Sequence, residues 1–301
     1  MEGFSMSNLD NMVLVARSAS QLLTVKISRL LGLKLVSVSF KRFPDGELYV
    51  RLLDSVEGCD VIVVQSTPPP QDSNLIELFL LVNGVIDQGA NSVTAVIPYL
   101  AYARQDKAFL PGEAVSGRYI CRMLCDCGVN KVITVNIHNT RVFDGLNVPF
   151  VDLNAAPLIG EHFKSFSLKN PIVLAPDEGA CKEGEAVARI LDCNFVFLEK
   201  HRDKYTGEIV TKEKHIDVSG SDVIIVDDII STGGTVVNAI SMAVKQGARA
   251  VHVACVHPLL IGDARLKIFN AGARSLVGTD SVPSDVSLIS LAPLIAGALE
   301  S

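Results

Sequence analysis

The sequence predicts an α/β protein made of two tandem domains of one kind, each a mainly parallel sheet flanked by helices. Short apolar runs rich in Val and Ile alternate with amphipathic helical patterns along nearly the whole chain, which is typical of βαβ units whose strands are buried on both faces. One stretch of the chain also resembles a later one. The 301 residues, 49% of them hydrophobic, are enough for two domains of about 150 residues each.

Nine apolar runs are expected to form strands. They lie at residues 12–16, 35–40, 61–65, 93–98, 132–138, 172–176, 195–198, 223–227 and 251–256. Amphipathic helical patterns fill most of the intervals between them. Because helical crossovers join parallel strands, we expect largely parallel sheets.

The repeat consists of a strand, a helix ending in Gln-Gly-Ala, and a second strand. The first copy reads "VIVVQS" at 61–66, "QGA" at 88–90 and "SVTAVIP" at 92–98, and the second reads "VIIVDD" at 223–228, "QGA" at 246–248 and "AVHVACVHP" at 250–258. Convergent composition could produce similar strands, but the shared helix ending favours two copies of one domain. We place the boundary near Leu153, which gives domains at 1–153 and 154–301.

The two copies differ after the first strand of the repeat. Gln65 and Ser66 stand where the second copy has Asp227 and Asp228, and "TPPPQDSN" replaces "IISTGGT". We therefore expect only the second copy to keep a loop that binds an anion. The first copy is expected to serve another purpose.

Composition narrows the classes of partner. With 27 Lys and Arg against 33 Asp and Glu, the net charge of −6 gives no basic field for a nucleic acid.

The N-terminus lacks the pattern of a signal peptide, and no apolar run reaches the roughly 18 residues of a membrane span. The seven cysteines include Cys121, Cys125 and Cys127, whose spacing fits neither a redox pair nor a zinc site. We expect a cytoplasmic protein with reduced thiols that acts on small molecules.

The strand at 223–227 leads into a motif that suits a phosphate. In open α/β sheets ligands collect at the carboxyl ends of strands, and a glycine-rich turn aims backbone N–H groups and the helix dipole at an anion. The turn here consists of Ser231, Thr232, Gly233, Gly234 and Thr235. It lacks the lysine of a Walker A motif and the glycine spacing of a dinucleotide fold, so a phosphate monoester is expected.

Asp227 and Asp228 precede this turn and would repel a phosphate. Carboxylates can accept hydrogen bonds from a vicinal diol, so a ligand with a phosphate at one end and hydroxyls about one sugar ring away fits both parts of the motif. Ribose 5-phosphate is such a ligand. Capping of the following helix would explain one aspartate but not the whole pattern.

The segment "VIIVDDIISTGGT" resembles the phosphoribosyl-pyrophosphate (PRPP) motif shared by type I phosphoribosyltransferases and ribose-phosphate pyrophosphokinases. Five further segments resemble the pyrophosphokinases in order and spacing, over nearly the whole chain. They are "FPDGELYVRL", "AVIPYLAYARQDKAF", "VNIHNTRVFDGL", "LAPDEGA" and "LEKHR". The resemblance implies two tandem type I phosphoribosyltransferase-like domains. It also implies transfer of the β,γ-diphosphoryl group of ATP to the anomeric hydroxyl of ribose 5-phosphate, giving AMP and PRPP.

The same resemblance implies roles for individual residues. It implies ATP binding by Phe43, Asp45, Gly46, Glu47, Arg104 and Gln105; Mg²⁺ binding by His138 and Asp177; catalysis by Lys200 and Arg202; and ribose 5-phosphate binding by Arg202, Asp227, Asp228, Ser231, Thr232, Gly233, Gly234 and Thr235. Without it, the segments around Phe43, Arg104 and Lys200 would be interpreted as a surface hairpin, a solvated turn and a solvated hairpin. An ATP site shared across a subunit interface implies a homo-oligomer, at least a dimer.

Three positions depart from the common family pattern. Asn136 stands where an aspartate is usual before His138, Ala180 stands where a second glycine is usual, and His201 stands where arginine is frequent.

Two alternatives remain. A type I phosphoribosyltransferase would leave the first domain unexplained, and a non-catalytic regulatory paralogue would be expected to lack the lysine segment or the ribose loop, both of which are present.

Overall fold

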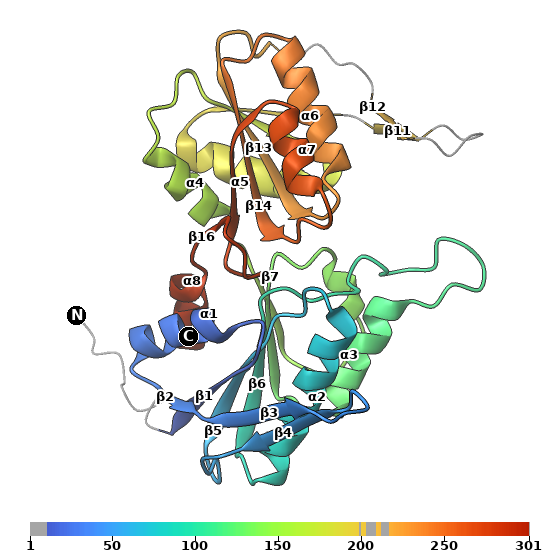
Figure 1. The fold of residues 1–301 in the computed structure, drawn as a ribbon, viewed down its shortest axis with the longest axis vertical. Helices are drawn as coiled ribbons and strands as arrows, with labels where there is room; N and C mark the ends of the chain where they lie inside the picture. The colour runs from blue at the N-terminus through green and yellow to red at the C-terminus, as the bar shows by residue number, and fades with distance from the viewer. Residues whose placement is uncertain (1–10, 199, 203–208, 212–216, 301) are drawn as a thin grey trace. The chain divides into compact units, whose positions relative to one another are not determined.

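The computed structural model describes residues 11–198, 200–202, 209–211 and 217–300, and the chain divides into two units (Figure 1). Unit 1 contains residues 11–153 together with Ser281–Pro283 and residues 290–300, and unit 2 contains Asn154–Asp280 and Ser284–Ile289. The last helix, α8 (Ala292–Glu300), belongs to unit 1 because it packs against α1 (Gln21–Leu31). The assignment of all of 154–301 to the second domain therefore differs from the structure at these C-terminal residues.

Unit 1 is built on a six-stranded parallel sheet with the order β2-β1-β5-β6-β7-β8. Its strands are β1 (Met12–Ala16), β2 (Lys34–Val36), β5 (Asp60–Val64), β6 (Ser92–Ile97), β7 (Lys131–Val135) and β8 (Phe150–Leu153). The helices α1 and α8 lie on one side of the sheet, and α2 (Gln71–Asp87) and α3 (Ser116–Asp126) lie on the other (Figure 1). An antiparallel hairpin, β3 (Val38–Arg42) and β4 (Leu48–Leu52), follows β2.

Unit 2 repeats this plan with the order β10-β9-β13-β14-β15-β16. Its strands are β9 (Ile172–Ala175), β10 (Asn194–Phe197), β13 (Asp222–Ile230), β14 (Ala250–Pro258), β15 (Ala273–Thr279) and β16 (Ser287–Ile289), and its helices are α4 (Ala156–Lys164), α5 (Cys181–Leu191), α6 (Gly234–Lys245) and α7 (Ala264–Asn270). A short hairpin, β11 (Lys200–Arg202) and β12 (Ile209–Thr211), follows β10.

The two units share one topology, which confirms the duplicated α/β fold expected from the sequence. In each unit the second strand (β2 or β10) pairs with the first strand (β1 or β9) at the edge of the sheet. A hairpin follows, and the next strand of the sheet (β5 or β13) pairs with the other side of the first strand. The order in which strands are added to the sheet therefore reverses between β1 and β5, and again between β9 and β13. Ligands bind at the carboxyl ends of strands beside such a switch point.

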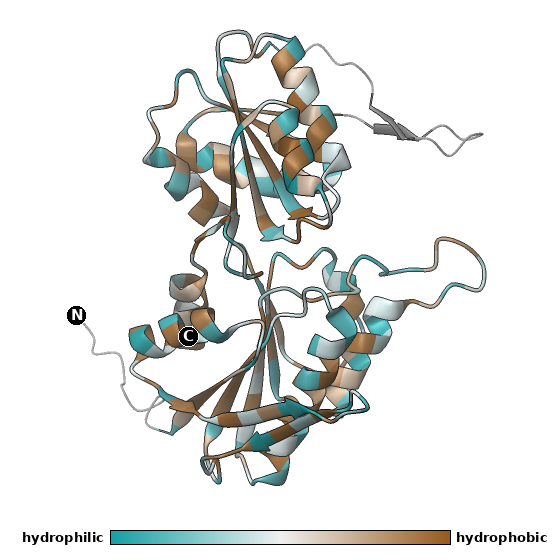
Figure 2. Ribbon diagram, in the orientation of Figure 1, coloured by the Kyte–Doolittle hydropathy of each residue, from teal (hydrophilic) through white to brown (hydrophobic). Residues whose placement is uncertain are grey.

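Burial on both faces explains the Val and Ile content of the strands. Val61 to Val64 of β5 and Val223 to Val226 of β13 are at most 2% exposed, and most strands of both sheets are hydrophobic (Figure 2). Each such side chain contributes about 1.5–3 kcal/mol by leaving water. Among the helices of the described ranges, none combines the length and apolar character required to cross a bilayer.

Several element limits differ from the sequence-based expectation. The run expected as one strand at 35–40 is divided between β2 and β3, and β7 ends at Val135 rather than at residue 138. Asn136 ends β7 because its φ of 39° is left-handed. The strands β15 and β16 were not expected, since "ARSLVGT" mixes polar and apolar residues and β16 is only three residues long.

A cluster of aromatic rings between α4 and β14 contains two histidines, His162 and His252. The ring of His252 lies 5.8 Å from that of Phe163 and 5.6 Å from that of Phe166, and its Nδ1 lies 2.7 Å from Ser275 Oγ. Burial lowers the pKa of His252, and it also lowers the pKa of His162 beside it. Both rings therefore favour the neutral form in the folded protein.

We predict that the free energy of unfolding decreases as the pH falls below about 6.5, where the unfolded chain takes up protons that the folded chain resists. The stabilisation is present above the unfolded pKa and is lost as the pH falls through the lower folded pKa. His252→Gln should reduce this slope in urea denaturation measured between about pH 7 and pH 5. An unchanged slope in the variant would show that His252 does not cause it.

Candidate active site

Two adjacent aspartates lie near the carboxyl end of β13, at the switch point of unit 2. Asp227 is 9% exposed, and Asp228 is half-buried. The Asp227 Oδ1 accepts a hydrogen bond from the N–H of Asp228 at 2.9 Å, and the Asp228 Oδ1 accepts one from the N–H of Ile229 at 2.7 Å. The strand runs on to Ile230, three residues beyond its expected end, so a regular backbone positions both carboxylates.

Burial raises the pKa of Asp227 well above its usual range, and the charges of Asp228 and Asp177 raise it further. The ionised form of Asp227 is thus disfavoured in the unliganded protein. A cation or a pair of hydroxyl donors at this place would stabilise the charge. The carboxyl group whose charge is disfavoured thus lies at the position where ligands bind in such sheets.

The turn after β13 leads directly into α6 and leaves the start of this helix open. Gly233 has a φ of 78°, which favours glycine, and no side chain caps α6 within the described part of the chain. The N–H groups of Leu260 and Ile261 donate to the carbonyls of Ile230 and Ser231, at 3.0 Å each. The turn is therefore fixed from one side, and the positive end of the α6 helix dipole lies next to it.

Ser231, Thr232, Gly234 and Thr235 are each exposed or half-buried, and Gly233 is buried. A Cβ at Gly234 would meet nothing within 4 Å, so the space beside it is open to a ligand.

A second turn at this edge of the sheet follows β9. Asp177 caps a short 3₁₀ helix (Glu178–Ala180), and its Oδ1 accepts a hydrogen bond from the N–H of Gly179 at 3.0 Å. It lies close enough to Asp227 to affect the pKa of that residue. The structure thus brings Asp177, Asp227 and Asp228 into one acidic region.

Ala180, the departure from the usual second glycine, is only 1% exposed. Its methyl group packs into the interior, while Gly179 is exposed. The methyl group of Ala180 therefore does not obstruct a ligand that approaches this turn.

We predict that Ala180→Gly leaves the KM of both substrates within about twofold of the wild type and lowers the free energy of unfolding by about 0.5–1 kcal/mol. The reason is that glycine adds backbone entropy to the unfolded chain and removes a buried methyl group. Steady-state kinetics beside thermal denaturation tests both parts. A markedly lower KM in the variant would mean that the methyl group does obstruct a ligand.

In unit 1, the hairpin of β3 and β4 presents Phe43, Asp45, Gly46 and Glu47 at its tip. The N–H of Phe43 donates to the Glu47 carbonyl, and the N–H of Gly46, which has a φ of 98°, donates to the Phe43 carbonyl, both at 2.9 Å. The Phe43 ring is 40% exposed, lies edge-on to Tyr49, and has the Lys41 Nζ 5.0 Å from its centroid. An exposed ring on a fixed turn is suited to stacking on a planar base.

Arg42 ties this hairpin to the helix α2. One guanidinium nitrogen donates to the Gly46 carbonyl and another to the Ser73 Oγ, both at 2.9 Å.

Two other loops of unit 1 carry Arg104, Gln105 and His138. The Arg104 side chain is exposed, and the Gln105 Nε2 donates to the Glu113 Oε2 at 3.2 Å. The Asn139 Nδ2 donates to the Asp106 Oδ2 at 2.6 Å. This hydrogen bond connects the loop after β6 with the turn after β7 that contains the exposed His138.

Asn136 and Asp152 both lie beside the turn that contains His138. Asn136 is 2% exposed and left-handed, a conformation that asparagine tolerates better than most residues. A carboxylate does lie near this turn, that of Asp152 on β8, and its Oδ1 accepts hydrogen bonds from Thr134 Oγ1 at 2.8 Å and from the Ile137 N–H at 3.0 Å. Sequence reasoning missed Asp152, because its proximity to Ile137 depends on the pairing of β7 with β8.

Lys200 and Arg202 lie in β11, paired with Thr211 and Ile209 of β12. Their side chains, and that of His201, lie outside the described part of the structure. Among the described residues, no three His, Cys, Asp or Glu side chains gather around one point as the ligands of a metal would.

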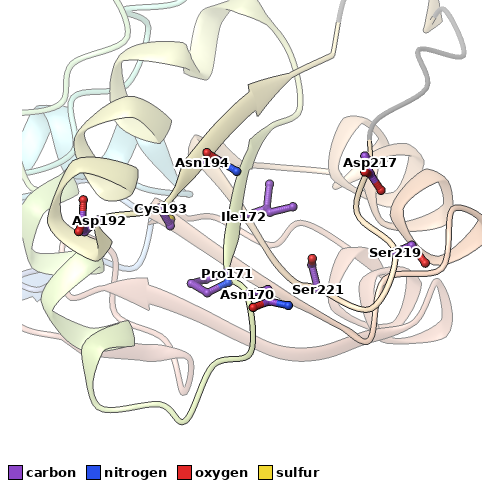
Figure 3. A pocket seen from close by; sticks show the side chains of 9 residues that line it. All are labelled: Asn170, Pro171, Ile172, Asp192, Cys193, Asn194, Asp217, Ser219 and Ser221. Atoms are coloured by element: carbon purple, nitrogen blue, oxygen red, sulfur yellow. The ribbon is translucent and has the colours of Figure 1, made fainter.

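A groove at the opposite edge of the unit 2 sheet contains none of these residues (Figure 3). It is lined at the amino ends of β9, β10 and β13 by Asn170, Pro171, Ile172, Asp192, Cys193, Asn194, Asp217, Ser219 and Ser221.

Comparison with known proteins identifies the family. Residues 12–128 match the N-terminal domain of ribose phosphate pyrophosphokinase, and residues 149–267 match the phosphoribosyl transferase domain. The ribose-phosphate pyrophosphokinase of Methanothermobacter thermautotrophicus is 45% identical over 289 residues, which cover 96% of this chain and all of that protein. The chain belongs to the ribose-phosphate pyrophosphokinase family.

Two further comparisons cover nearly the whole chain. The ribose-phosphate pyrophosphokinase of Methanosarcina acetivorans is 43% identical over 96% of this chain and 99% of its own length. The crystal structure of phosphoribosylpyrophosphate synthetase from Mycobacterium smegmatis matches with a TM-score of 0.84 and 28% identity, over 96% of this chain and 98% of that one. The family resemblance expected from the sequence motifs is confirmed.

Proposed function

We propose that this chain is a ribose-phosphate diphosphokinase that transfers the β,γ-diphosphoryl group of ATP to the anomeric hydroxyl of ribose 5-phosphate, giving PRPP and AMP. The observation that carries the proposal is the pairing, in unit 2, of two adjacent carboxylates, the buried Asp227 and the half-buried Asp228, with the start of α6. These two features match the two ends of ribose 5-phosphate. Membership of the pyrophosphokinase family supports the same reaction.

Ribose 5-phosphate would bind along the turn that follows β13. Its phosphate would accept hydrogen bonds from Ser231, Thr232 and Thr235 and from the first N–H groups of α6 around Gly233 and Gly234. Its ring hydroxyls would donate to the carboxylates of Asp227 and Asp228, which have acceptor capacity beyond their backbone hydrogen bonds. The sugar would thereby be oriented with respect to the helix.

ATP would bind through unit 1. Phe43 would stack on the adenine, the polar groups of Asp45, Gly46 and Glu47 would contact its edge, and Arg104 would offer parallel N–H donors to the phosphates, with Gln105 beside it. The exposure of Phe43 and Arg104 supports these roles, since neither side chain is buried in the fold.

Mg²⁺ is the proposed cofactor, and the carboxylates of unit 2 fit a cation. Burial raises the pKa of Asp227, and the charges of Asp228 and Asp177 raise it further, so bound positive charge would relieve the repulsion among these carboxylates. Asp177 in unit 2 and His138 in unit 1 are each proposed as a protein ligand of Mg²⁺, which prefers few protein ligands beside phosphate oxygens and water. When bound, the ion would neutralise charge on the transferred phosphates.

Lys200 and Arg202 are the proposed catalytic residues. Diphosphoryl transfer needs little covalent help and much compensation of charge on the β-phosphate as AMP leaves. An ammonium and a guanidinium on one short hairpin would provide it, and Arg202 would also contact ribose 5-phosphate.

We further propose a homo-oligomer in which the hairpin of β3 and β4 completes the ATP site of a neighbouring copy. The tip of this hairpin is exposed in the single chain. We also propose a cytoplasmic location, which the seven free cysteines support, since reduced thiols are usual in that compartment.

The reaction is tested by incubating the purified protein with Mg²⁺, ATP and ribose 5-phosphate and measuring AMP and PRPP separately. Equal amounts of the two products, dependent on the sugar, would support the proposal. ADP as the product would indicate transfer of a single phosphoryl group instead. Binding of ribose 5-phosphate without any AMP would favour a regulatory paralogue.

A further inference from the structure

The duplicated topology raises a question about unit 1, which retains a loop at the place of the ribose-phosphate turn. This loop, residues 65–70 between β5 and α2, is called the vestigial loop below. It lacks the two aspartates and the glycines of its counterpart. Instead, its residues Gln65, Ser66 and Thr67 are fully buried.

The buried hydroxyls of the vestigial loop bind the chain that follows β6. The Thr67 Oγ1 accepts a hydrogen bond from the N–H of Ala101 at 2.7 Å and donates to the carbonyl of Tyr99 at 3.0 Å. The N–H of Thr67 also donates to the Tyr99 carbonyl at 2.8 Å, and the Ser66 Oγ accepts from the N–H of Tyr99 at 3.2 Å. The backbone at 99–101 is thus bound at three of its polar groups.

The first turn of α2 binds the next residue in the same stretch. The hydroxyl of Tyr102 donates a hydrogen bond to the Asp72 Oδ1. Tyr102 has a φ of 68°, which is rare for a residue with a large side chain. Its carbonyl accepts from the N–H of Gln105 at 3.0 Å, which closes a tight turn over residues 102–105, called the ATP turn below. Arg104 lies within this turn.

The other side of the ATP turn rests on α3. The N–H of Gly117 donates to the Gln105 carbonyl at 3.2 Å. A Cβ on Gly117 would lie 2.8 Å from the Tyr102 carbonyl oxygen and 3.2 Å from that of Gln105, so only glycine allows this approach. The turn is therefore held between the vestigial loop with α2 on one side and α3 on the other.

We propose that Thr67 and Asp72 are positioning residues for ATP: in unit 1 the loop that once held a ligand's phosphate now holds the ATP turn, so that Arg104 and Gln105 meet the triphosphate. The inference rests on the proposed binding of ATP by Arg104 and Gln105. An exposed arginine binds phosphate well only if its backbone is fixed in advance, because ordering a mobile loop reduces affinity. Unit 2 uses its loop to bind substrate, and unit 1 uses the equivalent loop to order its own chain.

The test compares Thr67→Val with Thr67→Ser. Valine keeps the shape of the side chain but leaves the buried N–H of Ala101 without its partner, whereas serine keeps the hydroxyl. We expect the KM for ATP to rise about tenfold in Thr67→Val and to return near the wild-type value in Thr67→Ser. The KM for ribose 5-phosphate should stay within about twofold in both.

Hydrogen exchange gives a readout that does not depend on activity. In the protein without ligands, the amide of Ala101 should exchange faster in Thr67→Val than in the wild type or in Thr67→Ser. Unchanged exchange together with an unchanged KM for ATP would overturn the proposal. An equal rise in the KM of both substrates would also overturn it, since that result indicates general damage.

Asp72→Ala and Tyr102→Phe provide a second test on exposed side chains, in case Thr67→Val does not fold. Each should raise the KM for ATP by severalfold, and the double variant should cost no more than the larger single one, because both remove the same hydrogen bond. Asp87→Ala, the same substitution at the far end of α2, is the matched control and should not change the KM for ATP. Additive effects of the two variants, or an effect of Asp87→Ala as large as that of Asp72→Ala, would overturn the proposal.

The variant Arg104→Ala distinguishes this proposal from the one on which it rests, namely that Arg104 and Gln105 bind ATP. If Arg104→Ala raises the KM for ATP and Thr67→Val does not, Arg104 binds ATP but the vestigial loop does not position it. If Arg104→Ala leaves the KM for ATP unchanged, the ATP site is wrongly assigned, and the positioning role falls with it.

Discussion

Lys200→Ala is expected to lower kcat by about a thousandfold while leaving the binding of ribose 5-phosphate close to that of the wild type. In the proposed mechanism, Lys200 compensates charge that develops on the β-phosphate only as AMP leaves, and loss of one such donor costs about 10²–10³ in kcat. Because that charge is absent from the ground state, the Kd measured by calorimetry should change little. Circular dichroism should show an intact fold.

Lys164→Ala is a suitable control for the loss of a lysine. Lys164 is exposed and pairs with Glu161 at 2.7 Å on the helix α4, and such surface pairs contribute about 0–1 kcal/mol to stability. This variant should retain wild-type kinetics. A Lys200→Ala enzyme with near-normal kcat would contradict the catalytic role of the β11 hairpin.

Asp227→Asn is expected to make the folded protein more stable and the binding of ribose 5-phosphate weaker. Burial, with the charges of Asp228 and Asp177, raises the pKa of Asp227, so its ionised form destabilises the fold at neutral pH. Asparagine removes this charge, and we expect Tm to rise by about 2–4 °C, corresponding to about 1 kcal/mol. Loss of a charged acceptor should weaken ribose 5-phosphate binding by at least about tenfold.

The stability difference should depend on pH with a definite sign. A carboxyl group with a raised folded pKa contributes its full stability below its unfolded pKa of about 3.9 and loses it as the pH rises through the folded value. The advantage of Asp227→Asn should therefore be small near pH 4 and larger near pH 7. Asp228→Asn is the comparison, because it removes a neighbouring charge and should itself lower the pKa of Asp227. A lower Tm for Asp227→Asn at pH 7 would contradict this account.

Local patterns in the sequence predict much of the fold. The apolar runs of β5 and β13 and the glycine turn before α6 are visible without a structure, because burial on both faces and a left-handed φ at Gly233 restrict the residue types allowed. The internal repeat likewise predicts the common topology of the two units. Short strands such as β16 contain too few residues for a pattern.

The remaining features depend on tertiary contacts. The return of α8 to unit 1, the proximity of Asp152 to the turn before His138 and the hydrogen bonds of Thr67 to residues 99 and 101 join parts of the chain that lie far apart in sequence. The left-handed φ of Asn136, which ends β7, is a further example. The residue types at these positions are compatible with many environments, so no local pattern distinguishes them.

The duplication also gives the candidate site a simple origin. In both units the chain places a loop and a hairpin at matching points of the same topology. Unit 2 carries the proposed ribose 5-phosphate loop and the hairpin of Lys200 and Arg202, and unit 1 carries the vestigial loop and the hairpin of Phe43. We infer that the two proposed substrate sites arose from one ancestral arrangement, with the loop and the hairpin put to different uses in each copy.

Transfer of an intact diphosphoryl group is the central claim, and the fate of each phosphorus atom of ATP tests it most directly. The protein is incubated with Mg²⁺, ribose 5-phosphate and ATP labelled with ³²P at the α, β or γ position in separate reactions, and the products are separated. We predict that the β and γ labels both appear in PRPP and that the α label appears in AMP. Label from the γ position alone on the sugar, with the β label retained in ADP, would contradict the account.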